Sequence, residues 1–289
     1  MQIATAGWRR PLNGRIVRQT QRDAMSRYFG LDLSGYSTGR SGLAELRPVG
    51  DHFQALVYRD HPFARTAEGY TLLEEVCTPE REALSRMTEL GTLLVDVPLD
   101  VAALLTPEAP TFVWQLTARP VDFAFGALRP LADRIGAAVA RFRNVMRTSM
   151  VPNLKETYPA ACLAAAGLPS TLYKGQTITW DRDRWVGGML ADVASRMRIV
   201  ASAPLELTDD DVDAIICAYA GAAPLESVLA AESLRQAVHT RLRARVRAKE
   251  AHLIEQLTVP ANFQLFRTAP LRDIHVELCA WANFSDEAA

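Results

Sequence analysis

Tyr28-Phe29-Gly30-Leu31-Asp32-Leu33-Ser34-Gly35-Tyr36-Ser37-Thr38-Gly39 is the stretch from which the expected fold follows. It predicts a short apolar strand that ends at one carboxylate, Asp32, then a turn rich in glycine, serine and threonine, and then a second strand from Leu43 to Leu46. A charge inside a buried strand is costly unless a partner neutralises it. A metal ion is one such partner, and hard cations such as Mg²⁺ prefer carboxylate oxygens. The other acids that the fold brings to Asp32 therefore decide what this strand end does.

The first half of the chain has the pattern of a mixed sheet. Strands over 28–33, 42–47 and 53–59 follow one another at hairpin spacing, which predicts an antiparallel meander. Apolar periodicity predicts a helix over 68–91. The continuous apolar run at 92–99 is typical of a parallel strand buried on both faces, and it carries Asp96 near its end.

The second half alternates between short strands and helices. After a helical insertion at about 100–150, the segment 154–159 is expected to form a strand that carries Glu156, and a small-residue helix follows over 160–166. An amphipathic helix is predicted over 181–198. The helix over 208–222 begins with Thr208 and has Asp211 in the capping-box position. This order of elements predicts an α/β sheet with helices on both faces.

The two ends of the chain are basic. Residues 1–27 carry six arginines and one acid, and we expect a polar tail there. Residues 223–289 form an expected extension with a long basic helix over 232–257 and an edge strand within 263–281. Arg241, Arg245 and Lys249 line one side of that helix. They form either a solvated rim or a surface that contacts phosphates, and the sequence leaves both interpretations open.

Composition limits the classes of protein. The 289 residues have a net charge of −1, so overall charge does not indicate a nucleic-acid-binding protein. The four cysteines form no CxxC pair, which favours a reducing cytoplasm. No apolar run approaches the roughly 18 residues of a membrane span, so we expect no membrane partner.

The acids on separate elements predict a cation site. If the strands ending at Asp32 and Asp96 are neighbours and the later helix crosses their ends, its Asp210 and Asp213 converge on them. Carboxylates this close raise one another's pKa unless cations neutralise them. One or two Mg²⁺ or Mn²⁺ ions would resolve the conflict, and two such ions can activate water and stabilise a leaving oxygen in phosphodiester hydrolysis.

Five segments in order resemble a prokaryotic domain-of-unknown-function family described as predicted RNase H-like nucleases and, more distantly, RuvC-type resolvases. They are Gly30-Leu31-Asp32, Val95-Asp96-Val97-Pro98-Leu99, Glu156-Thr157-Tyr158-Pro159, Tyr173-Lys174 and Asp210-Asp211-Val212-Asp213-Ala214-Ile215-Ile216-Cys217-Ala218. The resemblance covers about residues 27–222, and we place an RNase H-like domain at 28–222. It implies a five-stranded mixed sheet whose first three strands are antiparallel.

The resemblance also implies roles for particular residues. Asp32, Asp96 and Asp213 would be catalytic metal ligands, and Asp210 would be a second polar residue on the same helix. Glu156 is a further catalytic candidate. Lys174 would contact a phosphate or pair with Glu156.

Each acid also has a purely structural alternative. Asp32 can open an Asx turn, Asp96 can cap the turn after its strand, and Asp210 can lie at a helix N-terminus because the dipole favours it there. Three functions therefore stay open. The first is a metal-dependent nuclease acting on DNA or RNA, and the second is an inactive RNase H-like module that binds nucleic acid or a protein. The third is a phosphotransferase of the sugar-kinase and actin superfamily, suggested only by the loop at 32–38.

Overall fold

A computed structural model describes residues 27–35, 40–50, 52–65, 72–97, 153–170, 172–223, 228–229, 265–266, 276–278 and 282–284. The predicted tail before residue 27, the helical insertion and the long helix with Arg241, Arg245 and Lys249 lie outside these residues.

The first five strands form the predicted mixed sheet. Strands β1 (Arg27–Asp32), β2 (Gly42–Val49) and β3 (His52–Asp60) pair antiparallel in sequence order. Strand β4 (Gly91–Val95) runs parallel to β1, and β5 (Leu154–Glu156) runs parallel to β4. The order along this part of the sheet is β5-β4-β1-β2-β3. The antiparallel meander and the buried parallel strand are confirmed.

The sheet does not end at β3, so the prediction of five strands was wrong. Strand β12 (Val276–Leu278) pairs parallel with β3, and β8 (Ile199–Ala201) pairs parallel with the other side of β12. Strand β13 (Ala282–Asn283) also pairs with β3, which makes eight strands in the described sheet. Residues 276–278 are therefore not an edge strand, because β8 covers the backbone groups that an edge would leave exposed. Alternation indicated this strand, but β8 is too short for its own periodicity to be recognised.

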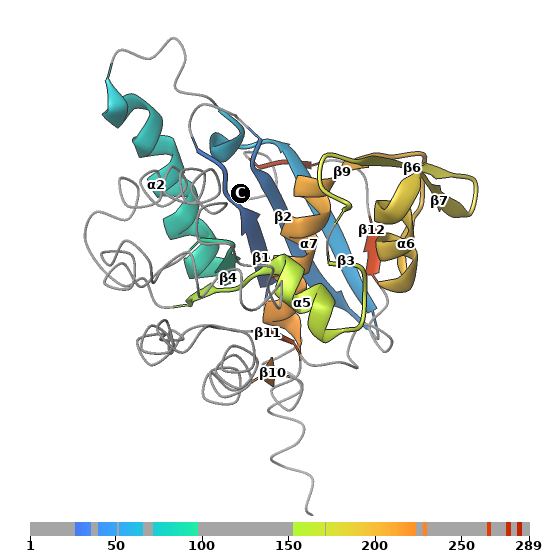
Figure 1. The fold of residues 1–289 in the computed structure, drawn as a ribbon. Helices are drawn as coiled ribbons and strands as arrows, with labels where there is room; N and C mark the ends of the chain where they lie inside the picture. The colour runs from blue at the N-terminus through green and yellow to red at the C-terminus, as the bar shows by residue number, and fades with distance from the viewer. Residues whose placement is uncertain are drawn as a thin grey trace, which may run out of the picture.

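Two helices cover opposite faces of the sheet. Helix α7 (Asp209–Ala222) lies across β1 and β2 on the face seen in Figure 1, with α5 (Pro159–Ala165) beside it. Helix α2 (Leu73–Leu90) packs Leu84 and Met87 against residues on the other face, among them Phe29 and Leu43. Because successive side chains of a strand point to opposite faces, α2 and α7 receive alternate residues of β1 and β2.

A smaller three-stranded sheet corrects the predicted helix over 181–198. Strands β6 (Thr177–Asp181) and β7 (Arg184–Val186) form a hairpin, and β9 (Glu206–Thr208) pairs with the other edge of β6. Helix α6 (Gly188–Arg196) begins only after this hairpin. The alternating sequence Thr177-Ile178-Thr179-Trp180, just before the predicted helix, has the period of two that a strand requires.

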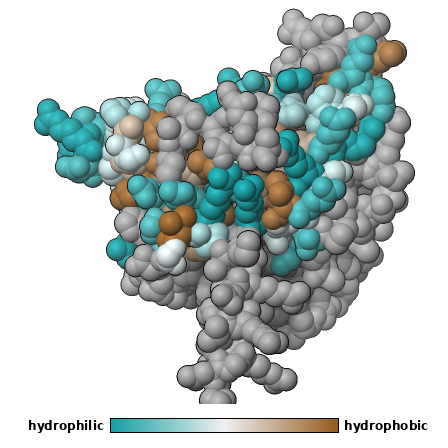
Figure 2. Space-filling view, turned by 180° about the vertical axis from the view of Figure 1, so that it is seen from behind, coloured by the Kyte–Doolittle hydropathy of each residue, from teal (hydrophilic) through white to brown (hydrophobic). Residues whose placement is uncertain are grey.

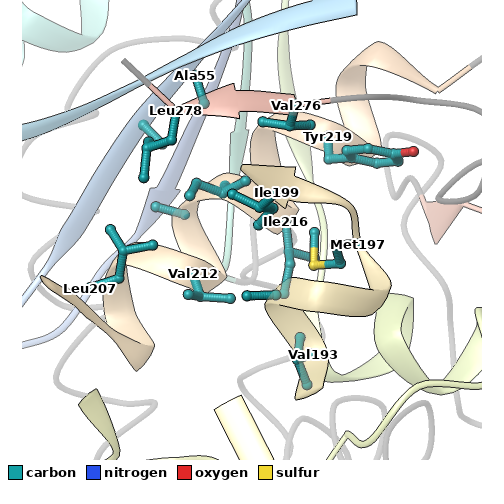
Figure 3. Packing of buried hydrophobic residues seen from close by; sticks show 14 of the residues in the cluster. Ala55, Val193, Met197, Ile199, Leu207, Val212, Ile216, Tyr219, Val276 and Leu278 are labelled. Carbon is teal, nitrogen blue, oxygen red and sulfur yellow. The ribbon is translucent and has the colours of Figure 1, made fainter. Parts of the chain in front are cut away.

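The remaining elements are short, namely the 3-10 helix η1 (Pro62–Ala64) and the pair β10 (Val228–Leu229) and β11 (Leu265–Phe266). A continuous apolar core joins the two sheets to α6 and α7. Figure 3 shows Ile216 and Tyr219 of α7 packed near Ile199 of β8 and Val276 of β12. None of the helices within the described residues is long and apolar enough to cross a membrane.

Two glycines let α7 lie directly on the strand backbones. A Cβ on Gly30 would lie 2.0 Å from the carbonyl oxygen of Ala214 and 2.3 Å from the backbone nitrogen of Ala218. A Cβ on Gly42, the register partner of Asp32, would lie 2.0 Å from the carbonyl oxygen of Asp210. Both clashes involve backbone, which cannot rotate away as a side chain can. Any larger residue therefore lifts α7 from the sheet.

We expect Gly30→Ala to lower the free energy of unfolding by about 3 kcal/mol, because the extra methyl group overpacks a backbone contact. Urea denaturation measures this change. The control is Gly50→Asn in the turn between β2 and β3, where a Cβ meets nothing within 4 Å and asparagine tolerates the positive φ of 64°. Equal stability of Gly30→Ala and the wild type would contradict this view of how α7 packs.

Candidate functional site

The site lies at the edge of the sheet where the parallel strands β1 and β4 end. Asp32 is the last residue of β1, and Asp96 follows β4 and donates its backbone N–H to the carbonyl of Leu31 at 3.0 Å. Leu31 and Val95 pack on the α2 face, so the alternation of strand side chains directs Asp32 and Asp96 to the α7 face. The structure thus places these two predicted acids on neighbouring strands and on the same face.

The beginning of α7 brings further carboxylates to this edge. Thr208 caps the helix by accepting from the N–H of Asp211 at 3.2 Å, and the Asp211 carboxylate accepts from the Thr208 N–H at 2.7 Å. This reciprocal cap confirms the predicted start of the helix. Asp213, two residues after Asp211, is fully buried. Arg59 pairs with Asp211 at 3.0 Å, so Asp211 holds the helix start in place and does not face the cluster.

Lys174 supplies the cation that the cluster contains in this structure. Its ammonium forms an ion pair with Asp213 and lies 3.8 Å from Oδ2 of Asp32. The hydroxyl of Tyr173 donates to the other oxygen of Asp213 at 2.8 Å. The N–H of Gly175 donates to the carboxylate of Asp209 at 2.9 Å, which ties the loop bearing Lys174 to the first residue of α7.

Burial dominates the acid–base properties of these carboxyls. It raises the pKa of Asp32 to about 8, with Lys174 opposing the rise and the charges of Asp213, Asp210 and Asp209 adding to it. Burial and the charge of Asp32 hold the pKa of Asp96 well above its usual range. Burial also raises the pKa of Asp213, although Lys174 and Tyr173 oppose that rise. At the rim, burial and Asp209 raise the pKa of Asp210 to about 6. The site therefore has a strong affinity for positive charge, whether from protons or from other cations.

Burial and the neighbouring charges have opposite effects on the pKa of Lys174. Burial disfavours its charged form, but the carboxylates of Asp213 and Asp32 outweigh that effect and hold its pKa well above the ordinary value. Its side chain nevertheless remains about half exposed, at 53%. An ammonium that is charged, half exposed and carried on a loop can leave the cluster when another cation or an anion competes for its contacts.

Some predicted residues lie elsewhere. Glu156 is buried, but it lies beside Val95 in the register of β4 and β5, which directs it to the α2 face. The ion pair expected between Lys174 and Glu156 is accordingly replaced by the contacts of Lys174 with Asp213 and Asp32. Glu156 still acts on the site at a distance, because its charge raises the pKa of Asp96.

Sequence reasoning missed Asp209 and the role of Tyr173. Asp209 was overlooked because three successive aspartates at a helix start are favoured by the dipole alone. The sequence singles out the dipeptide of Tyr173 and Lys174, but only the folded loop shows that both side chains contact Asp213.

The carboxylate oxygens at this site are suitable ligands for a hard cation, but in this structure they are not arranged to hold one. Carboxylate oxygens are the ligands that Mg²⁺ and Mn²⁺ prefer, and Asp32, Asp96 and Asp213 supply them from three elements. Within the part of the chain that the structure describes, no three His, Cys, Asp or Glu side chains form a group ready to hold a metal ion. The ammonium of Lys174 lies between the carboxylates of Asp32 and Asp213, and a metal ion would have to displace it.

Comparison with known proteins gives a family but no activity. A family model described as "Protein of unknown function (DUF429)" matches residues 75–230, more than half of the chain. No curated protein and no solved structure matches the chain.

We expect the metal-free protein to become less stable as pH rises from about 4 to about 8. Asp32 loses its proton near pH 8 in the native state but near its ordinary pKa of 3.8 when unfolded, so the native state binds more protons across this window. Lys174 stays protonated throughout the window and does not change the sign. Melting temperatures measured in a chelator should fall with pH, and the fall should be smaller in Asp32→Asn. The exposed Asp192→Asn on α6 is the control, and a wild-type melting temperature that is flat or rises with pH would contradict the prediction.

Proposed function

The chain belongs to the DUF429 family of proteins of unknown function, and we propose from its site that it is a divalent-metal-dependent nuclease with an RNase H-like fold, which hydrolyses phosphodiester bonds in DNA or RNA. The family description carries no activity, so the proposal rests on the arrangement of the residues.

The architecture supports the RNase H-like part of the proposal. The strand order β5-β4-β1-β2-β3, with the first three strands antiparallel and the other two parallel to β1, agrees with the sheet that the sequence resemblance implies. Strands β12 and β8 add to the outer side of β3, away from the carboxylates. They therefore enlarge the sheet without changing the edge at which the acids meet.

The single observation that carries the nuclease proposal is that Asp32 and Asp213 flank one cation. They come from a strand and a helix far apart in the sequence, yet the ammonium of Lys174 contacts one and lies 3.8 Å from the other. Two desolvated carboxylates are costly to keep beside each other for structural reasons alone. Perturbed pKa values at such a convergence are typical of functional sites.

Each side chain then has a definite role. Asp32, Asp96 and Asp213 offer the oxygens that would hold Mg²⁺ or Mn²⁺, which when bound activates water and stabilises the leaving oxygen. Tyr173 holds the Asp213 carboxylate in one orientation through its hydrogen bond. Lys174, once displaced from the carboxylates, pairs with a phosphate oxygen of the substrate. Asp210 lies at the rim of the cluster, where its half-buried carboxylate can accept a hydrogen bond from water.

The position of Lys174 also supports an alternative from a different class. A resident ammonium neutralises the carboxylates without any metal, as a module that binds nucleic acid or protein but lacks catalysis would require. The two possibilities differ in one measurable property. The nuclease exchanges Lys174 for a metal ion, whereas the module does not.

We expect Mg²⁺ or Mn²⁺ to raise the melting temperature of the wild type and not that of Asp32→Asn. A ligand that binds only the native state stabilises it by about 2.7 kcal/mol at 100 times its Kd. For a chain of this size that is a rise of roughly 5–10 °C. Asp192→Asn, a charge-matched variant on exposed α6, should behave as the wild type does.

The same variants test catalysis. With labelled single-stranded and structured DNA and RNA oligonucleotides, the wild type and Asp192→Asn should cleave in Mg²⁺ or Mn²⁺, whereas Asp32→Asn and Asp213→Asn should fall to background. Full cleavage by a folded Asp32→Asn would refute the assignment. Metal-independent binding without cleavage would favour the non-catalytic module.

We expect Lys174→Gln to bind the metal ion more tightly than the wild type by about tenfold or more. Two unit charges about 4 Å apart interact by about 4 kcal/mol near a protein surface, and the substitution removes a cation that competes for the same oxygens. Isothermal titration with Mn²⁺ measures the affinity. Arg196→Gln, which removes an exposed cation on α6, is the matched control, and weaker metal binding by Lys174→Gln would show that Lys174 assists the metal rather than competes with it.

A further inference from the structure

A pocket of about 230 Å³ opens beside the middle of α2, away from the acidic cluster. It is lined by the end of β3, η1, one face of α2 and a residue that follows β13. The lining residues are Asp60, His61, Pro62, Arg65, Pro79, Glu82, Ala83, Arg86 and Phe284. In Figure 2, α2 descends from the upper right, and the outer surface that it presents is mostly hydrophilic.

This pocket lies at the same edge of the sheet as the carboxylates. Strand β2 runs antiparallel to both β1 and β3, so β1 and β3 end at the same edge, with Asp32 opposite Gly42 and Tyr58 opposite Leu43. Asp60 is therefore about two strand spacings, or roughly 10 Å, from Asp32 along the edge. The acidic cluster lies on the α7 face, and the pocket lies on the α2 face.

The pocket combines two guanidinium groups with an apolar lining. Arg65 follows η1 and Arg86 projects from α2, so the fold brings together cations that are 21 positions apart in the sequence. Among the residues that the structure describes, Arg86 forms no ion pair, although Glu82 lines the same pocket one turn away. Buried Ala83 and Phe284 lower the local dielectric, which strengthens any charge contact made there.

The guanidinium groups of Arg65 and Arg86 indicate which class of ligand the pocket would bind. The planar fork of N–H donors in a guanidinium matches the oxygens of a phosphate, and the group is held as a cation at any physiological pH. Asp60, Glu82 and Arg65 are exposed, so they lie at the mouth of the pocket, and the half-buried Arg86 is its more enclosed cation. His61, only 3% exposed, adds an imidazole to the wall.

We propose that this pocket binds a phosphate group through Arg65 and Arg86. Given the proposed function, on which this part rests, the phosphate belongs to the backbone of the polynucleotide a few nucleotides from the bond that is cut. The distance of roughly 10 Å along the sheet edge is short enough for one bound strand to reach both the pocket and the carboxylates. The polynucleotide then crosses the edge from the α7 face to the α2 face, and binding to the pocket fixes its direction over the carboxylates.

The test uses Arg86→Gln in the full chain, with Arg196→Gln on exposed α6 as the matched control. Fluorescence anisotropy in a chelator measures the affinity for a labelled single-stranded oligonucleotide at several salt concentrations. Loss of one phosphate contact should weaken binding about tenfold and should reduce the steepness of the log–log salt dependence by about 0.7. A merely structural role of Arg86 would not change the salt dependence.

A second arm identifies the source of the phosphate. Inorganic phosphate at constant ionic strength should raise the melting temperature of the wild type and of Arg196→Gln but not that of Arg86→Gln. Loss of both responses in Arg86→Gln supports a pocket that a polynucleotide uses, and loss of only the response to inorganic phosphate supports a pocket for a small phosphate compound. Unchanged binding in both arms would overturn the proposal.

Failure of this proposal is distinguishable from failure of the nuclease proposal. Asp192→Asn on exposed α6 should keep the wild-type salt dependence, because its side chain belongs to neither site. A changed slope in Arg86→Gln without any metal-dependent cleavage supports the pocket and contradicts the nuclease. Cleavage with an unchanged slope and an unchanged response to inorganic phosphate in Arg86→Gln supports the nuclease and overturns the pocket.

Discussion

The direct contact between the backbone of α7 and the backbones of β1 and β2 is the constraint on which the site depends. It exists because Gly30 and Gly42 have no side chains that would hold the helix away from the sheet. With the helix this close, Asp213 reaches the end of β1, and the loop tied to Asp209 brings Lys174 to both acids. A side chain at either glycine would move α7, and with it Asp213, away from the end of β1.

The close contact of α7 with β1 and β2 also has an electrostatic consequence. Asp32 and Asp213 lose most of their hydration, and burial is the largest effect on the pKa of each. The structure resolves the resulting instability with the ammonium of Lys174, a hydrogen bond from Tyr173 and a tendency of Asp32 to keep its proton. Each of these is reversible, since a lysine can move and a proton can leave. The cluster is therefore prepared to exchange one form of positive charge for another, which is the property that a metal-dependent enzyme needs and a purely structural ion pair does not.

The fold was predictable where the chain has strong periodicity, and the errors came from short segments. The meander, the parallel strand before Asp96 and the cap at Thr208 follow from alternation, apolar runs and capping chemistry. The helix predicted over 181–198 includes the second half of the hairpin, residues 181–186, and β8 escapes recognition, because a strand of three residues has too few positions for its period to be distinguished. The two-sided pairing of β12 was likewise not predictable, because alternation identifies a strand but not its neighbours.

The sequence by itself determined which residues carry charge into apolar segments. Asp32, Asp96 and Asp213 were identifiable because a carboxylate at the end of a buried strand or within an apolar helix requires a partner. Only the tertiary structure decided which partner each one has. It placed Glu156 on the α2 face, placed Lys174 between Asp32 and Asp213, added Asp209 to the cluster, and brought Arg65 and Arg86 to one pocket. The physical reason is that the cost of burying a charge is a local property of the chain, whereas its neutralisation depends on groups that only packing brings within a few ångströms.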